Sequence, residues 1–469
     1  MAPAKPAARE GSGTLLRQLG LVSAIALVVS NMIGTGIFTA TGFLAADLAS
    51  PGLVLGIWVV GALIALTGAF CYSELGINFP SSGGEYVYLT RAYGPTWGFM
   101  TGWASFFAGF SAPIAAAALA FSDYLGYFFP AVKQENALTL GSGSFQVHLG
   151  GAQLLASSLI LMFTVLNFFG VQRVARIQNA LTALKVLVLL SFIILGFLAG
   201  TGSWDHFSEP ATRTSTTPIA AQFAFSLFFI YVSYSGWNAA TYVAEELRRP
   251  ERNLPLALAI GTLLVAALYV GLNVLFIYGV PLEQMKGVIA IGSLAASHLF
   301  GPGIAGIFSA LMAVSLMSTV NAMVTIGPRV YYAMAKNRAF FASAAKVDER
   351  WHTPVNAIIA QGICAMLFTA MRFTDLFFFI GITLNFFAVM SVTSLFVFRR
   401  RPGWQKLRVV SFLFPLVPSI FIVSGIWVTF YGLRLNPAWS SIVIAMIAVS
   451  ALIYHFYLRQ RTIESNPGE

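Results

Sequence analysis

Long apolar stretches dominate the chain, and short polar stretches separate them. A helix needs about 20 apolar residues to cross roughly 30 Å of hydrocarbon, so each long stretch is predicted to be a transmembrane helix. The predicted fold is therefore an all-α membrane protein with twelve transmembrane helices. A further stretch, 281–300, is short for a crossing and is predicted to be an outer lid or re-entrant piece. The twelve segments lie at about 18–43, 52–79, 96–122, 151–169, 177–200, 219–244, 254–279, 302–334, 354–371, 375–398, 409–432 and 438–458.

Two of these segments are interrupted near their middles by residues that disfavour a helix. The first contains Gly-Thr-Gly-Ile-Phe at 34–38, and the second contains Ser-Tyr-Ser-Gly-Trp-Asn at 233–238. At mid-bilayer depth no water rescues freed backbone groups, so irregular backbone survives only in buried sites or beside a cavity. Broken segments at corresponding positions in two halves are typical of a transporter's binding site.

The two interruptions divide the chain into comparable halves. Residues 15–200 hold helices 1–5 and residues 219–398 hold helices 6–10, so an interrupted helix leads each half. An odd number of helices per half inverts the second half, which predicts a 5+5 inverted repeat with substrate bound where the halves meet. Helices 11 and 12, within 409–458, lie outside the repeat. Residues 1–14 and 459–469 are predicted to be cytoplasmic tails.

The charged residues fit this interpretation. Only 9% of the chain is charged, against about 25% in soluble domains. The net charge of +10 would suggest nucleic acid in a soluble protein. Of the 27 Lys and Arg, however, 21 fall in the tails and the loops after even-numbered helices, five fall in the opposite loops, and Lys185 lies inside a helix. This asymmetry predicts a multi-pass protein of the cell membrane with both termini cytoplasmic, and it excludes a nucleic-acid partner.

Several kinds of chemistry find no support in the sequence. The five histidines are scattered, no phosphate-binding glycine loop is present, and no nucleophile and base converge at membrane depth. We therefore expect no metal, no cofactor and no enzymatic activity. Cys71 and Cys364 both fall in membrane segments, so we expect no disulfide-linked heavy subunit.

Four motifs, in order along the chain, resemble those of the amino acid–polyamine–organocation (APC) transporter superfamily, and most closely its L-type amino acid transporter branch. The resemblance covers nearly all of 15–460 and implies the leucine-transporter fold, alternating access, and sodium-independent exchange or uptake of neutral amino acids. The motifs are Asn-Met-Ile-Gly-Thr-Gly-Ile-Phe at 31–38; Tyr-Ser-Glu-Leu at 72–75 with Pro-Ser-Ser-Gly-Gly-Glu-Tyr at 80–86; Ser-Gly-Trp-Asn at 235–238 with Glu-Glu at 245–246 and Pro-Glu-Arg-Asn-Leu-Pro at 250–255; and Arg-Val-Tyr-Tyr-Ala-Met-Ala at 329–335 with His-Thr-Pro at 352–354.

The first interruption suits a carboxylate. A half-helix that begins there presents free N–H groups at its positive end, and the amides of Thr35, Gly36 and Ile37 are the candidates. Gly34 and Gly36 would let the carboxylate approach closely, although they could instead serve close helix packing.

The ends of the preceding half-helices offer free carbonyls for an ammonium group. Because no acidic residue lies at mid-membrane, a zwitterion is favoured over a polyamine. The candidate carbonyls belong to Asn31, Ile33, Val232 and Ser233.

The resemblance also assigns side chains to the pocket. It implies that Tyr234, Ser235 and Trp237 face or gate it, and that Asn321 and Asn385 line it. Packing is the alternative for the tryptophan. An interhelical hydrogen bond, worth about 0.6 kcal/mol, is the alternative for each asparagine.

Four acidic residues lie near predicted cytoplasmic helix ends: Glu74, Glu85, Glu245 and Glu246. They are expected to pair with cytoplasmic arginines as an inner gate, or else to be solvated. No buried Asp, Glu or His stands out as a proton carrier.

Lys185 is the exception among the basic residues, because a lysine at a helix centre costs about 2.5–3.5 kcal/mol. It could extend towards the cytoplasm. The resemblance implies instead a fixed cation beside the first interruption, where related transporters hold sodium, and this would make sodium unnecessary.

Two other functions stay open at this stage. A proton-coupled carrier of cationic amino acids or polyamines would require an acidic pocket residue. A non-transporting amino acid sensor could use the same fold. The sequence does not choose between exchange, proton symport and uniport.

Overall fold

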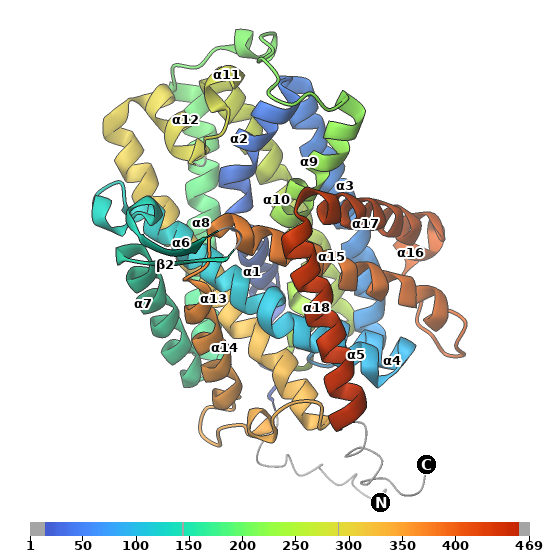
Figure 1. The fold of residues 1–469 in the computed structure, drawn as a ribbon. Helices are drawn as coiled ribbons and strands as arrows, with labels where there is room; N and C mark the ends of the chain where they lie inside the picture. Colours follow the sequence, from blue (N-terminus) through green and yellow to red (C-terminus); the bar gives the residue numbers. More distant parts are fainter. Residues whose placement is uncertain (1–14, 143–144, 289, 459–469) are drawn as a thin grey trace, which may run out of the picture.

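A computed structural model describes residues 15–142, 145–288 and 290–458, so the predicted tails at 1–14 and 459–469 lie outside the described residues. The protein is a bundle of long helices that run between two faces (Figure 1). The described chain begins at one of these faces, and α18 ends there. We call this face the terminal face. The face that carries α11 and α12 is the opposite face.

The first part of the bundle contains one interrupted helix and one continuous three-part helix, α5–η1–α6, whose middle is a π-helix. The elements are α1 Leu21–Met32, α2 Gly36–Leu48, α3 Pro51–Asn78, α4 Glu85–Tyr93, α5 Pro95–Ala104, η1 Ser105–Ser111, α6 Ala112–Leu125, η2 Pro130–Val132, η3 Gln134–Asn136, β1 Leu138–Ser142, β2 Phe145–Leu149, α7 Gly151–Leu166, η4 Asn167–Phe169, α8 Val171–Ala199 and η5 Trp204–Phe207.

The second part contains the other interrupted helix. Its elements are α9 Ile219–Tyr234, η6 Ala239–Glu246, α10 Pro250–Gly279, α11 Leu282–Met285, α12 Ile291–Phe300, α13 Pro302–Lys336, η7 Ala342–Ala345, α14 Val355–Phe368, α15 Phe373–Phe398, α16 Arg408–Phe412, α17 Leu416–Leu435, α18 Pro437–Ile453 and η8 Tyr454–Leu458.

Eleven helical stretches among the described residues are long and apolar enough to cross a membrane. Each coincides with one of the twelve predicted segments. The remaining segment, 354–371, contains the 14-residue helix α14, which is short for a crossing, so twelve crossings stay a prediction. The stretch 281–300 holds α11 and α12.

The all-α prediction is wrong at one place, the β1–β2 hairpin. Leu138 pairs with Leu149 and Leu140 with Val147, and the His148 N–H donates to the Ala370 carbonyl at 2.8 Å. Apolar residues alternate with polar or small ones along both strands, which is the period of a strand and not of a helix. A prediction based on long apolar runs overlooks so short a segment.

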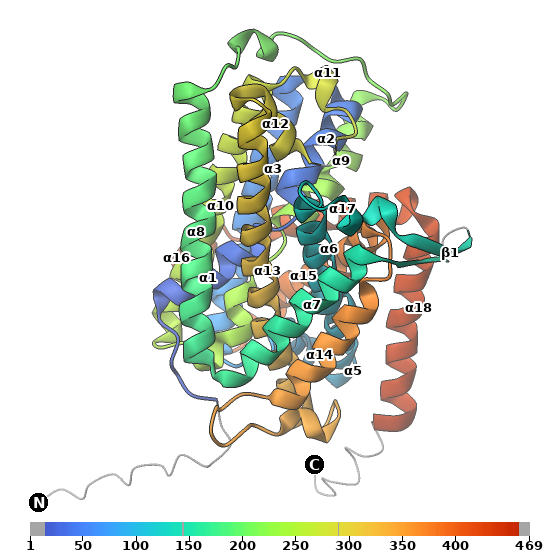
Figure 2. The ribbon, with the colours of Figure 1, turned by 90° about the vertical axis from the view of Figure 1, so that its left-hand side faces the viewer.

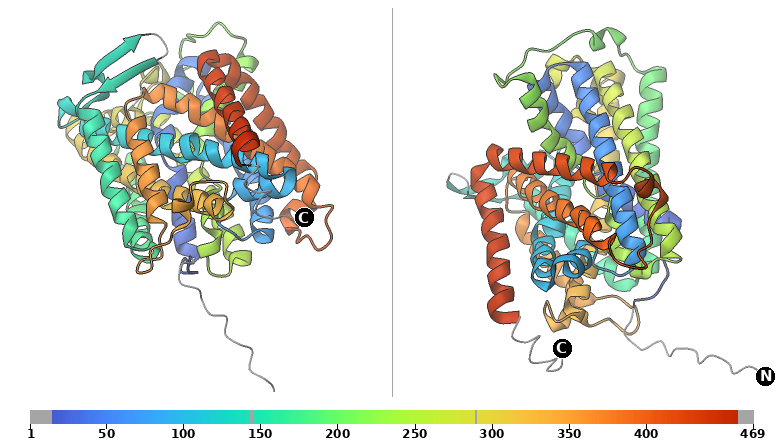
Figure 3. Two further views of the ribbon diagram at one scale, coloured as in Figure 1. Left: turned by 60° about the horizontal axis from the view of Figure 1, so that its bottom comes forward. Right: turned by 90° about the vertical axis from the view of Figure 1, so that its right-hand side faces the viewer.

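The interrupted helices lie at the centre of the bundle. α3, α8 and α10 run side by side along the molecule, and α6, α13 and α15 cover the other sides (Figure 2). Figure 3 shows α17 and α18 at the periphery. Large apolar side chains of these two helices, such as Val423 and Leu452, are exposed, as expected of a surface that contacts lipid.

Candidate functional site

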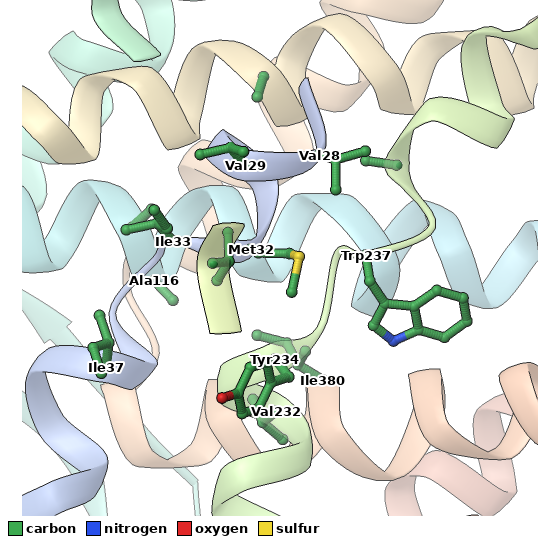
Figure 4. Packing of buried hydrophobic residues seen from close by; sticks show 14 of the residues in the cluster. Val28, Val29, Met32, Ile33, Ile37, Ala116, Val232, Tyr234, Trp237 and Ile380 are labelled. Atoms are coloured by element: carbon green, nitrogen blue, oxygen red, sulfur yellow. The ribbon is translucent and has the colours of Figure 1, made fainter. Parts of the chain in front are cut away.

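The backbone leaves helical geometry at both predicted interruptions. α1 ends at Met32, Ile33 has φ −75° and ψ 84°, and α2 begins at Gly36. α9 ends at Tyr234, and Gly236 has φ +99°, a left-handed conformation that favours glycine. Figure 4 shows the two irregular segments and the apolar side chains that pack around them.

Two glycines let the irregular segments pack directly against each other. A Cβ at Gly36 would lie 2.6 Å from the Ser233 Cα, and a Cβ at Gly236 would lie 2.8 Å from the carbonyl oxygen of Asn31. Both distances are too short for any side chain. By contrast, a Cβ at Gly34 would meet nothing closer than a methyl group at 3.8 Å. Gly36 therefore serves close packing, whereas Gly34 has room for a Cβ at ordinary van der Waals distance.

The buried side chain of Lys185 reaches the first interruption from α8. Its ammonium Nζ donates to the Ile33 carbonyl at 2.8 Å, the Thr319 hydroxyl at 2.8 Å and the Ser30 carbonyl at 3.4 Å. The Thr319 hydroxyl in turn donates to the Ile33 carbonyl at 2.8 Å. The lysine thus places its Nζ donor at the carbonyl end of α1, where the helix dipole is negative. It does not extend towards the terminal face.

A tyrosine that the sequence did not single out connects the two interruptions. The Tyr269 hydroxyl of α10 lies 2.7 Å from the Met32 carbonyl and 3.0 Å from the Ser233 carbonyl, so its one proton can be donated to either. Tyr269 stands in an apolar run, where an aromatic residue is ordinarily part of the core. No sequence signal marked it or Thr319.

Two of the predicted carbonyl acceptors already have hydrogen-bond donors within the protein. The Val232 carbonyl accepts from the Ser235 N–H at 3.1 Å and hydroxyl at 2.7 Å, and the Ser233 carbonyl faces Tyr269. The side-chain Oδ1 of Asn31, which was not among the predicted acceptors, is buried and has no donor among the described residues. A buried acceptor without a donor is costly, and a bound ammonium group would satisfy it.

The donors lie on the other side of the first interruption. The N–H groups of Gly36 and Ile37 open α2 and have no acceptor within that helix, since the first N–H groups of any helix lack one. Thr35 caps α2 without a side-chain hydrogen bond. The unpaired Asn31 Oδ1 and the N–H groups that open α2 thus come from residues on either side of Gly34 in the sequence.

A cavity of about 460 Å³ lies on the side of the opposite face and reaches Thr35. It is large enough for an amino acid, since small-molecule pockets range from about 300 to 1,000 Å³. Asp123 at its lining accepts a hydrogen bond from the Gln134 N–H at 3.0 Å. The lining residues are Thr35, Phe38, Thr39, Ala120, Asp123, Tyr124, Tyr127, Lys133, Gln134, Glu135, Ala290, Ser293, Ser309, Phe373 and Thr374.

Neither predicted asparagine reaches this cavity. The Asn321 amide donates to the Gln178 side chain at 2.7 Å. The Asn385 amide donates to the Gly425 carbonyl at 2.6 Å and the Thr429 hydroxyl at 2.7 Å. In this structure both side chains connect neighbouring helices, which is the alternative that the sequence allowed.

Tyr234 and Trp237 are also packed away from the cavity. The Tyr234 hydroxyl donates to the Trp58 carbonyl at 3.0 Å. The Trp237 ring lies edge-on to Tyr72, 4.7 Å between centroids, and to Phe421 at 5.5 Å. In this conformation the tryptophan joins η6 to α3 and α17.

The terminal face is closed by ion pairs. Buried Glu246 binds Arg329 at 2.8 Å, and buried Glu74 binds Arg399 at 2.6 Å. A main-chain bridge between Leu19 and Leu247 holds the start of the described chain against the end of η6. The expected partners were arginines, and these two glutamates have them.

The other two predicted gate residues behave differently. Glu245 lies 3.8 Å from Lys336, at the surface. Glu85 meets no cation among the described residues, and only hydroxyl and amide groups donate to it.

A multi-pass helical protein with paired irregular segments beneath a cavity belongs to the class of membrane transporters. The model of one family, described as amino acid permease, matches residues 19–452, so the chain belongs to that family. Within the APC superfamily it falls in the L-type branch. Its members transport amino acids and are not enzymes.

Curated relatives agree with this placement. The chain is 30% identical over 446 residues to the large neutral amino acids transporter small subunit 2 of Oryctolagus cuniculus, covering 90% of this chain and 78% of the relative. It is 28% identical to the b(0,+)-type amino acid transporter 1 of Mus musculus, covering 94% and 88%. It is 29% identical to the Asc-type amino acid transporter 1 of Mus musculus, covering 87% and 75%.

Proposed function

We propose that this protein exchanges or takes up neutral amino acids across the cell membrane, independently of sodium, by alternating access. It would use the leucine-transporter fold with a 5+5 inverted repeat, in which α1–α2 and α9–η6 are the broken helices 1 and 6. The cavity at Thr35 and the ion pairs at the terminal face together correspond to a conformation open on the opposite side and closed on the terminal side.

The observation that carries sodium independence is the position of Lys185. Its ammonium already donates to the carbonyls of Ser30 and Ile33 and to the Thr319 hydroxyl. Oxygen groups of this kind would otherwise suit a sodium ion. A covalently attached cation at this point removes the need for a bound one.

Preference for a neutral amino acid follows from the groups that stay unpaired. The N–H groups of Gly36 and Ile37 would hold the carboxylate, and the Asn31 side chain would accept from the ammonium. The space beside Gly34 would admit the backbone of the substrate. Neither interruption contains an acidic residue that would select a second positive charge.

Transport by the purified protein in liposomes tests this proposal. Neutral amino acids should accumulate, at rates unchanged when sodium is replaced by choline. Uptake should be faster with amino acid inside if exchange dominates. Arginine and putrescine belong in the panel, because Asp123 and Glu135 line the cavity. Preferential uptake of those cations, with a pH gradient, would replace this proposal with the proton-coupled carrier. Binding without transport would indicate a sensor.

The relatives named as small subunits raise the question of a partner. Both cysteines of this chain, Cys71 and Cys364, are buried and free. A buried thiol within the helical bundle does not reach a second subunit. We therefore propose that transport needs no disulfide-linked heavy subunit, and the same liposome assay, which contains only this chain, tests that statement.

We also propose that the terminal face is cytoplasmic, because most Lys and Arg lie there. In a variant lacking Cys71 and Cys364, Glu135→Cys should react with an impermeant thiol reagent outside intact cells, and Lys406→Cys should not. Both positions are exposed, so accessibility reports the side and not burial. Opening the cells should make Lys406→Cys reactive. The reverse pattern would invert the orientation.

A further inference from the structure

Glu85 is a buried carboxyl group that meets no cation among the described residues. It opens α4 and is 5% exposed. Its Oε1 accepts from the Tyr72 hydroxyl at 2.9 Å and from the Asn238 amide at 2.8 Å, and its Oε2 accepts from the Tyr242 hydroxyl. The Asn238 amide also donates to the Tyr242 hydroxyl at 3.0 Å. All three donors are neutral.

The neighbouring buried carboxylates are built differently. Glu74 accepts from Nε and Nη2 of Arg399, from the Trp404 indole and from the Leu407 N–H, and Glu246 pairs with Arg329. An arginine keeps a buried carboxylate ionised. Glu85 meets no cation among the described residues, so burial favours its protonated form while its three hydrogen-bond donors favour the ionised form.

The titratable groups that face Glu85 come from four elements. They are Tyr72 on α3, Tyr88 on α4, Tyr231 on α9 and Tyr242 on η6. The buried charged residues of the terminal face are paired with one another, Glu74 with Arg399 and Glu246 with Arg329. Burial raises the pKa of the Glu85 carboxyl, while the hydrogen bonds from Tyr242 and Tyr72 oppose that rise.

The position of Glu85 ties its protonation to the gate. Asn238 ends the second interruption and Tyr242 lies on η6, which follows it at the terminal face, whereas Tyr72 belongs to α3. Gly84 permits this contact, because a Cβ there would lie 2.5 Å from the Tyr242 ring. In the proposed alternating-access cycle, opening of the terminal face would separate η6 from α4, break the hydrogen bonds to Asn238 and Tyr242, and expose the carboxyl to water.

We propose that Glu85 is a proton-binding site of the inner gate: while the terminal face is closed it holds a proton on Oε2, which then donates to the Tyr242 hydroxyl oxygen, and it releases that proton to the terminal side when the gate opens. The cavity on the opposite side does not include Glu85 among its lining residues, so the proton exchanges with the terminal side alone. This proposal rests on the proposed alternating-access function. It adds control of the gate by the pH on one side, without net proton transport.

The sign of the pH effect follows from the two environments. The closed state has the higher Glu85 pKa, and in the open state water returns it towards about 4.3. Lower pH on the terminal side therefore favours the closed state and slows transport. Glu85→Gln is neutral at every pH and keeps the side-chain shape, so it should behave as the protonated form.

Transport in right-side-out membrane vesicles, with the luminal pH varied between about 5 and 8, provides the test. The wild-type rate should rise with luminal pH. The Glu85→Gln rate should be low and flat, and the two curves should converge at the acid end. Glu349→Gln, which alters an exposed carboxyl in the loop after α13, should keep the wild-type curve. An unchanged curve in Glu85→Gln, or a flat wild-type curve, would overturn the proposal.

A second measurement does not depend on transport. In a background lacking Cys71 and Cys364, Ala240→Cys lies buried on η6 and becomes reactive only when the gate opens. Its labelling from the terminal side should accelerate as pH rises and should stay slow when Glu85→Gln is added. Equal labelling in both backgrounds contradicts the role of Glu85. If labelling depended on pH through Glu85 but the protein did not transport amino acids, the proposed transport function alone would be rejected.

Discussion

Lys185→Ala is expected to lose most amino acid transport, by tenfold or more, while the protein stays folded in the membrane. The substitution removes the ammonium from beside the carbonyls of Ser30 and Ile33 and leaves the Thr319 hydroxyl as the remaining donor to Ile33. Loss of a partner from a buried polar group costs about 1–3 kcal/mol, and 1.4 kcal/mol corresponds to a factor of ten. The measurement is the initial rate of uptake in liposomes.

Two comparisons make this result specific. Lys346→Ala, which removes an exposed lysine near the terminal face, should transport at the wild-type rate. Replacement of sodium by choline should leave the wild type unaffected. A Lys185→Ala protein with nearly normal transport, or a wild type that depends steeply on sodium, would contradict the proposal that this lysine replaces a bound ion.

The sequence located this lysine because charge at membrane depth is rare and costly. It also located both interruptions, since glycine, serine and asparagine in the middle of long apolar segments oppose a helix. It did not identify which carbonyls the lysine meets. Ile33, the residue that caps the end of α1, supplies the nearer of the two carbonyl acceptors.

Contacts between distant segments account for most of what the sequence could not predict. Tyr269 and Thr319 act at the interruptions through hydroxyl groups, yet each lies in an ordinary apolar helix. Asn321 and Asn385 have the polarity expected of a pocket, but their partners on other helices decide their role. Glu85 was expected to meet an arginine or to be solvated. The fold brings tyrosines to it instead, and sequence spacing carries no trace of that.

Gly36→Ala is expected to abolish transport and to lower the thermal stability of the protein. The added Cβ would lie 2.5 Å from the Ser233 hydroxyl oxygen and 2.6 Å from its Cα, so the backbone of α2 or α9 must move. Overpacking of this kind typically costs about 1–3 kcal/mol. The movement would also shift the N–H groups of Gly36 and Ile37, which are proposed to hold the carboxylate. Uptake and the unfolding temperature of the purified protein measure the two effects.

Two further alanine variants distinguish an effect on helix packing from an effect on the approach of the substrate. Gly56→Ala places its methyl group in open space within α3, so neither stability nor transport should fall. Gly34→Ala meets no atom closer than 3.8 Å, so it should fold normally but raise the KM for amino acid by occupying the space proposed for the substrate. If Gly34→Ala transported with an unchanged KM, the substrate would not pass beside Gly34. If Gly36→Ala were as stable and active as Gly56→Ala, the two interrupted helices would not pack as closely as this structure shows, and the site built on their contact would have to be abandoned.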